Sequence, residues 1–249
     1  PHPVLPPAKN LVAMNRLLCL ALLSFAACGQ SPKPTTPTPP APAARMVADR
    51  QAYYPRLLQL AHGPDRGSLL LSFDTDGFGG ALYHSTDNGN SWQLRAEMAD
   101  TTKPHHCCSG LWEVPQQLGG TEAGTLFWTT SVGKPRDPRS ATAMNIFRST
   151  DAGKSWTLFS TPVRGSVGLW EAEFIVDPQG RLVMYYSTEE HRAEGFNQLL
   201  AHKVSTDGGK TWGPEVRDVA VPDLPDRKMR PGMAIVRRLP NGRYAMTYE

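Results

Sequence analysis

Short apolar runs of strand length recur along this chain, separated by turns rich in glycine, proline or asparagine. One such turn, Pro178-Gln179-Gly180, lies between the runs LWEAEFIV and RLVMYYST. Long stretches of helical periodicity are absent. The pattern predicts an all-β protein with four hairpins of this kind, at residues 53–74, 109–131, 167–188 and 229–249.

A second series of strand, turn and strand lies between these hairpins, and its turn is an eight-residue motif. The motif reads STDNGNSW from Ser85, STDAGKSW from Ser149 and STDGGKTW from Ser205. The copies start 64 and 56 residues apart, in phase with the hairpins. Four short strands in each unit are typical of a β-propeller blade.

The motif S-T-D-x-G-x-[ST]-W resembles the Asp-box of the sialidase-like superfamily of propellers, and the resemblance covers roughly residues 50–249. It implies an all-β, six-bladed β-propeller. Because the chain stops after the second strand of a fourth unit, we expect a fragment with about four blades.

The Asp-box residues are expected to be structural, because in the family these turns lie at the outer edge, away from the central pocket. The aspartate can accept N–H bonds within its own turn, the glycine supplies a positive φ, and the tryptophan packs onto the blade. The residues with this expected role are Ser85, Asp87, Gly89, Trp92, Ser149, Asp151, Gly153, Trp156, Ser205, Asp207, Gly209 and Trp212.

The N-terminal part is expected to be a targeting region. Residues 1–13 fit no signal-peptide pattern and are interpreted as an upstream extension, whereas 14–27 have a basic start and an apolar stretch, as a secretion signal does. The FAAC stretch resembles a bacterial lipobox, which implies lipidation of Cys28; ordinary signal-peptidase cleavage is the alternative. A Pro/Thr-rich tether, 28–45, precedes the folded part, 46–249. We therefore expect a bacterial cell-envelope protein, either a membrane-anchored lipoprotein or secreted or periplasmic.

Composition and charge narrow the function only by exclusion. The 26 basic and 23 acidic residues give a net charge of +3, which does not indicate a nucleic-acid partner. No cofactor is expected. In KPHHCCS, residues 103–109, adjacent side chains are poorly spaced to converge on zinc, so no metal is expected either. Cys107 and Cys108 are consistent with a vicinal disulfide or with two reduced thiols.

Candidate chemistry follows from the hairpins, because the start of the first strand and the end of the second lie at the same end of an antiparallel pair. Eight positions are therefore expected to share one rim, where a polar ligand would bind. The expected strand starts are Arg56, Glu113, Glu171 and Arg230, and the expected strand ends are Asp74, Ser131, Ser187 and Glu249.

Glycoside hydrolysis requires two carboxylates, one that donates a proton to the leaving oxygen and one that attacks or activates water. Glu171, in GLWEAEF, resembles the glutamate of a Leu-Trp-Glu stretch in exo-arabinanase-like enzymes. Glu249 resembles their second catalytic glutamate. Glu173 would point to the same face as Glu171 and is the natural confounder. Both candidates could instead be solvated strand-end carboxylates.

A sialidase interpretation uses other residues. Asp76, in DTDGFGG, resembles the acid/base aspartate of sialidases, although Asp74 fits as well and both could belong to a simple turn. Arg56 resembles the first arginine of their triad, which would bind a substrate carboxylate. Where sialidases have a second arginine this chain has Ser187 and Thr188, and Arg230 is one candidate for the third.

Three functions remain open at this stage. The first is an exo-acting glycoside hydrolase that cleaves terminal sugars, arabinofuranosyl or similar. The second is an exo-α-sialidase, and the third is a non-catalytic carbohydrate-binding propeller, because a fold alone does not fix function. An oligosaccharide or glycan is the expected partner in each. Trp112 and Trp170 could be sugar-stacking platforms, although strand tryptophans more often belong to the core.

Overall fold

The computed structural model describes residues 44–76, 79–99, 106–133 and 141–249. The chain divides into two compact units, 1–44 and 45–249, and only the second is described below. The expected extension, the signal and Cys28 lie outside the described residues. Within the described ranges, no helix is long and apolar enough to cross a membrane.

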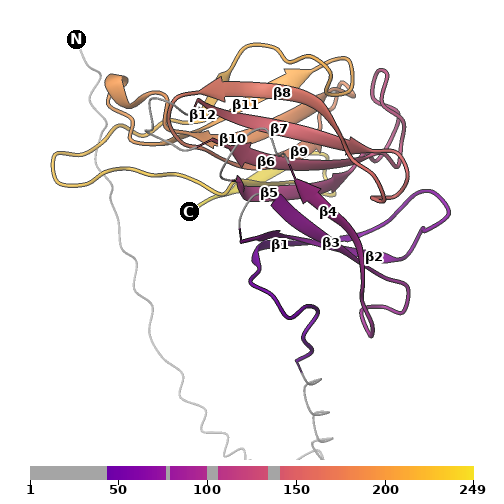
Figure 1. The fold of residues 1–249 in the computed structure, drawn as a ribbon. Helices are drawn as coiled ribbons and strands as arrows, with labels where there is room; N and C mark the ends of the chain where they lie inside the picture. The colour runs from indigo at the N-terminus through magenta and orange to yellow at the C-terminus, as the bar shows by residue number, and fades with distance from the viewer. Residues whose placement is uncertain (1–43, 77–78, 100–105, 134–140) are drawn as a thin grey trace, which may run out of the picture. The chain divides into compact units, whose positions relative to one another are not determined.

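The described part is built from antiparallel sheets whose strands follow the chain order (Figure 1). Three sheets have four strands each, in the orders β1-β2-β3-β4, β5-β6-β7-β8 and β9-β10-β11-β12, and β13 pairs with β14 in a fourth. Their bounds are β1 Tyr53–Gln59, β2 Leu69–Thr75, β3 Gly79–Ser85, β4 Gln93–Ala99, β5 His106–Glu113, β6 Leu126–Val132, β7 Thr142–Ser149, β8 Thr157–Gly165, β9 Leu169–Val176, β10 Leu182–Thr188, β11 Leu199–Ser205, β12 Val216–Val219, β13 Ile235–Arg238 and β14 Tyr244–Thr247.

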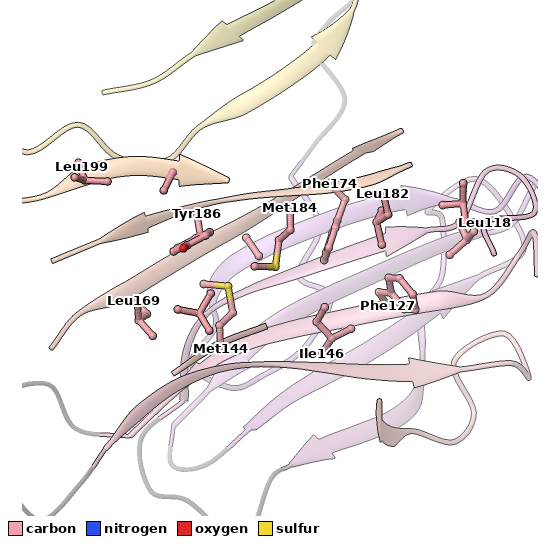
Figure 2. Close-up of a cluster of buried hydrophobic side chains, with 14 residues drawn as sticks. Leu118, Phe127, Met144, Ile146, Leu169, Phe174, Leu182, Met184, Tyr186 and Leu199 are labelled. Atoms are coloured by element: carbon pink, nitrogen blue, oxygen red, sulfur yellow. The ribbon is translucent and has the colours of Figure 1, made fainter. Parts of the chain in front are cut away.

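Consecutive sheets pack through their first strands, since β5 contacts both β1 and β9, and β13 contacts β9. Side chains from the second and third sheets fill the space between them (Figure 2). Phe127 and Met184 are fully buried there, and Phe127 stacks on Phe159 with ring centroids 5.6 Å apart. The predicted all-β, propeller-type architecture is confirmed.

Each eight-residue motif folds into the same hydrogen-bonded turn. In the second copy, the Ser149 hydroxyl donates to Asp151 (2.7 Å) and accepts from the N–H of Gly153 (2.8 Å). Asp151 also accepts from the N–H of Ser155, and the Trp156 indole donates to the carbonyl of Gly153. Although partial burial opposes it, these bonds lower the pKa of Asp151 to about 2. The aspartate is therefore engaged inside its own turn.

The first and third copies share this arrangement. Gly89 and Gly209 donate their N–H to the motif serine, at 2.9 and 2.7 Å. Both glycines have positive φ, 82° and 98°, where an L side chain would be strained. The motif turns therefore connect the third and fourth strands of the first three blades, and their carboxylates accept structural hydrogen bonds.

Candidate active site

A β-bulge interrupts the first strand of every blade at the same place. Two residues of this strand lie opposite one residue of the second strand, and the first of the two has a positive φ. The four residues are Tyr54 (φ 50°), Cys108 (63°), Glu171 (51°) and Met233 (52°). A left-handed conformation costs a non-glycine residue about 1–2 kcal/mol. Strain of this kind often collects at functional sites.

The residue on the second strand beside each bulge is also equivalent from blade to blade. Tyr53 pairs with Asp74, Cys107 with Ser131 and Trp170 with Ser187, while Gly232 and Glu249 exchange backbone hydrogen bonds. The four expected strand ends therefore occupy one level of the structure. We call the bulge residues and these partners the mouth; its members are Tyr54, Asp74, Cys108, Ser131, Glu171, Ser187, Met233 and Glu249.

Among the expected strand starts, only Glu171 lies at a bulge. Arg56 lies two residues beyond the bulge of its strand and pairs with Ser72. Arg230 precedes the last bulge and approaches the carboxylate of Glu249 to 3.9 Å. The expectation that all four strand starts share the rim is therefore wrong for Arg56, which lines the cavity described below.

The expected position of Glu113 is also wrong. Glu113 ends β5 and pairs with Leu126 at the opposite end of the hairpin. Its buried carboxylate accepts hydrogen bonds from the N–H groups of Ala61 (2.7 Å) and His62 (3.0 Å). The ring Nδ1 of His62 lies 3.0 Å from the same carboxylate. Glu113 therefore connects the first two blades and is not part of the mouth.

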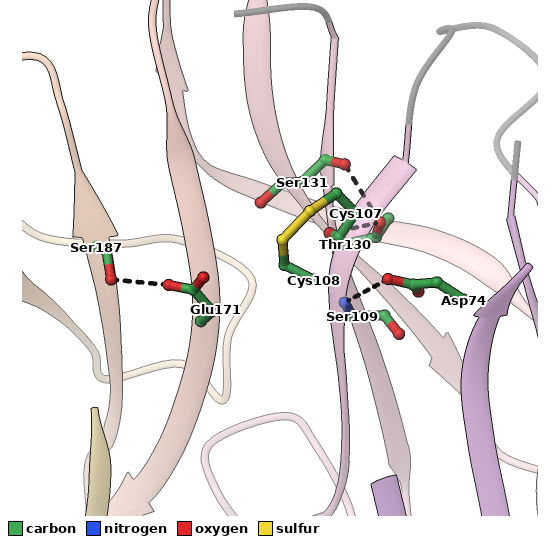
Figure 3. The surroundings of a disulfide bond; sticks show 8 residues. All are labelled: Asp74, Cys107, Cys108, Ser109, Thr130, Ser131, Glu171 and Ser187. Carbon is green, nitrogen blue, oxygen red and sulfur yellow. Dashed lines mark hydrogen bonds between the residues drawn. A yellow bond between two sulfur atoms is a disulfide. The ribbon is translucent and has the colours of Figure 1, made fainter. Parts of the chain in front are cut away.

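Glu171 is a buried acid of the mouth that accepts a hydrogen bond from a hydroxyl group. The residue is only 8% exposed, and the Ser187 hydroxyl donates to its carboxylate at 2.9 Å (Figure 3). Burial raises the pKa of Glu171, and this effect outweighs the bonds from Ser187 and the backbone N–H of Met233. A carboxyl group with a raised pKa can hold a proton that it later donates.

Glu249 offers a carboxylate of a different kind. Its side chain is 58% exposed, and the guanidinium of Arg230 is its cationic neighbour. The charges of Glu171, Asp74 and Glu249 add to the effect of burial in raising the pKa of Tyr54, while Arg230 opposes it. These side chains of three blades therefore act on one another across the mouth.

The two aspartates near the first hairpin differ in environment. Asp74 is 3% exposed and accepts a hydrogen bond from the N–H of Ser109 at 3.2 Å (Figure 3). Asp76 is exposed in the turn after β2, where the Gln51 amide lies 3.0 Å from its carboxylate. Of the two, the register places Asp74 in the mouth.

The expected tryptophan platforms do not lie together. The ring of Trp112 packs on Phe127 and Phe174, with centroids 6.0 and 5.3 Å apart, so it belongs to the core between blades. The Trp170 ring covers Gly168, where an added Cβ would lie 2.3 Å from the indole. Trp112 also lines the cavity described below, whereas Trp170 does not.

A cavity of about 420 Å³ follows the mouth along the first strands of the blades. Arg56, Glu173 and Arg237 line it, and Glu173 forms an ion pair with Arg237. Glu173 is thus paired with Arg237 in the cavity, whereas Glu171 does not line it. Within the described ranges, no group of three or more His, Cys, Asp or Glu side chains is placed to hold a metal ion.

The raised pKa of Glu171 predicts a pH-dependent cost to stability. Between the unfolded pKa, near 4.5, and the higher folded value, the folded state binds more protons, so stability falls as pH rises through this window. Glu171→Gln should therefore raise the melting temperature at about pH 8 and change it little at about pH 4. Thermal unfolding at both pH values measures this. The same shift at both values would contradict a buried, ionising carboxyl group.

Known structures share this architecture. An α-L-arabinofuranosidase from Fusarium graminearum in complex with an iminosugar inhibitor has a TM-score of 0.68 and 26% identity, over 82% of this chain and 57% of that one. An α-L-arabinanase from Penicillium chrysogenum complexed with arabinobiose has a TM-score of 0.66 and 28% identity, over 81% and 59%. A thermostable family-43 glycoside hydrolase, at 15% identity and a TM-score of 0.57, shares the fold alone. No protein-family model and no curated protein matches the chain.

These similarities bear on the motif-based resemblance. The chain spans less than two thirds of the length of the Fusarium and Penicillium proteins. The predicted resemblance to the sialidase-like superfamily, with arabinanase-like glycoside hydrolases among its members, is confirmed.

Proposed function

We propose that the full-length protein is an exo-acting glycoside hydrolase that removes terminal arabinofuranosyl or similar units, with Glu171 and Glu249 as its carboxylate pair. One observation carries the proposal: a buried, strained glutamate with a raised pKa shares the mouth with an exposed glutamate on the neighbouring blade. The similarity to an arabinofuranosidase and an arabinanase supports the substrate class.

The environments of the two glutamates suggest their roles. Protonated Glu171 donates its proton to the glycosidic oxygen as the bond to the anomeric carbon breaks. Ser187 holds the carboxyl group in place through their hydrogen bond. Ionised Glu249 either takes a proton from a water that attacks the anomeric carbon, or attacks that carbon itself to form a glycosyl-enzyme, which water then hydrolyses with Glu171 as the base. The two residues then perform the donor and acceptor halves of hydrolysis.

A neutral sugar fits the mouth better than sialic acid. Recognition of a free substrate carboxylate calls for arginines that converge on it. In the described part of the chain, Arg230 lies beside Glu249, whereas Arg56 lines the channel. Asp76, the sialidase acid/base candidate, is an exposed turn residue. These positions weaken the sialidase alternative.

Turnover of paired substrates tests the proposal. The full-length protein should cleave arabinobiose and an aryl α-L-arabinofuranoside and leave an aryl α-sialoside intact. Cleavage of the sialoside alone would favour the sialidase alternative. Binding of arabinobiose without turnover of either substrate would indicate a non-catalytic carbohydrate-binding propeller.

We also propose that the protein is anchored at the bacterial cell envelope through a lipid on Cys28. The support is the sequence of the leader, with an apolar stretch before FAAC and a Pro/Thr-rich tether after it. The intact mass of the mature protein from a bacterial membrane fraction should show a lipidated Cys28 as the N-terminal residue. Release of Cys28→Ala into the soluble fraction would agree, whereas an unlipidated mature N-terminus would overturn the proposal.

A further inference from the structure

A disulfide bond joins the adjacent residues Cys107 and Cys108 at the mouth. It occupies the bulge of the second blade, since Cys107 pairs with Ser131 and Gly110 with Thr129. In the third blade the same two pairings involve Trp170 and Glu173, with Glu171 at the bulge. Cys108 is therefore the structural counterpart of Glu171 on the neighbouring blade.

The disulfide lies between two acidic residues. Figure 3 shows the sulfur atoms on the side of β5 that faces Glu171, with Asp74 on the other side of the strand. Asp74 is tied to this bulge through the N–H of Ser109. Cys107 is half-buried and Cys108 is 3% exposed, an exposure comparable to the 8% of Glu171.

The bond also fixes the backbone. Cys108 has a φ of 63°, a conformation that a non-glycine residue seldom adopts. Closing a small ring through the intervening peptide bond restricts the torsions on both sides of it. The result is a rigid surface of sulfur and methylene groups, which are polarisable and form only weak hydrogen bonds.

The equivalent bulge positions of the other blades carry Tyr54, Glu171 and Met233, and none of these side chains is cross-linked to its neighbour. A furanose or pyranose ring presents hydroxyl groups at its edge and C–H groups on a face. Carboxylates can bind the edge, whereas the C–H face gains dispersion energy from an apolar wall. We propose that the Cys107–Cys108 disulfide is this wall and determines how the terminal sugar is positioned beside Glu171.

This inference rests on the proposed function and predicts an effect on substrate affinity. In the full-length protein, Cys107→Ser/Cys108→Ser should raise KM for arabinobiose about tenfold with little change in kcat, which corresponds to about 1.4 kcal/mol of binding free energy. Reduction of the parent with a phosphine should have the same effect. Loss of kcat and melting temperature at unchanged KM would show a structural role only and overturn the inference.

The double variant is also the control for reduction. From residue 44 to residue 249 the chain has no other cysteine, so the phosphine should leave the KM of the double variant unchanged. A change in its KM equal to that of the parent would assign the effect to another part of the protein and contradict the inference.

A second measurement does not depend on turnover. In Glu171→Gln, saturating arabinobiose should slow reduction of the disulfide, followed by alkylation of the thiols and mass spectrometry. Protection without turnover by the parent would support the wall and reject the proposed function. Turnover by the parent without protection would do the reverse, and the absence of both would reject both.

Discussion

The Glu171→Gln variant of the full-length protein should hydrolyse arabinobiose about 10³-fold more slowly than the parent, within the range expected for loss of general acid catalysis. Glutamine keeps the size of the side chain and can still accept the bond from Ser187, but its amide N–H is not acidic enough to transfer a proton to the leaving group. An arabinofuranoside with a strongly acidic phenol as leaving group needs no such proton. Its hydrolysis should therefore decline much less.

Two further observations sharpen this test. The basic limb of the pH profile of kcat/KM should disappear in Glu171→Gln, because that limb reports loss of the donated proton. Glu173→Gln is the matched control, since Glu173 lies two residues away and forms an ion pair with Arg237 in the channel. If Glu173→Gln lost activity and Glu171→Gln kept it, the assignment of the acid would be wrong.

The Glu249→Ala variant should also have a kcat about 10²–10⁴-fold lower than the parent. The decrease should be similar for substrates with good and with poor leaving groups. Its carboxylate acts as the nucleophile or as the base that activates water, and a better leaving group does not compensate for the loss of that role. Added azide should restore part of the turnover of the aryl arabinofuranoside, because a small anion fits the space left by the side chain. Product analysis by NMR would identify the glycosyl azide.

The azide product also reports the stereochemistry. A product with configuration opposite to that formed by the parent indicates that Glu249 is the nucleophile of a retaining enzyme. Arg230→Lys is a useful companion, because it keeps the positive charge near Glu249 and should reduce turnover far less than Glu249→Ala. Parental kcat in Glu249→Ala without azide would exclude Glu249 from the reaction.

Local sequence signals predicted the repeating part of the fold. The motif turns are encoded within eight residues, where a serine, an aspartate and a glycine satisfy one another's hydrogen bonds. Their spacing set the phase of the blades. In an antiparallel hairpin, the end of the second strand lies beside the start of the first. This geometry correctly predicted that the four strand ends occupy one level, namely Asp74, Ser131, Ser187 and Glu249.

Position along the first strands was predicted less well, and a repeated tetrapeptide explains one error. GLWE occurs at 110–113 and 168–171, and Glu113 and Glu171 were both expected at strand starts. The connection after β5 spans 114–125, whereas the one after β9 spans only 177–181. The longer connection shifts GLWE to the far end of β5. The glycines at 119, 120 and 124 were the available sign of that longer turn.

The bulges could not be read from the sequence. Each requires a positive φ, which glycine usually marks, yet the residues present are Tyr54, Cys108, Glu171 and Met233. Their conformation is imposed by strand pairing on both sides and not by local preference. Membership of Tyr54 and Met233 in the mouth therefore depended on tertiary structure, as did the choice of a disulfide for Cys107 and Cys108.

The four bulges give the mouth four side-chain positions with the same backbone conformation, which makes them suitable for protein engineering. Since the backbone sets the direction of each side chain, a library at Tyr54 and Met233 would vary the groups offered to a ligand while leaving the blades paired. Glycine at these two positions relieves the left-handed strain and offers no side chain, so it is the reference variant of such a library. Substrate scope could then be redesigned blade by blade around a fixed Glu171.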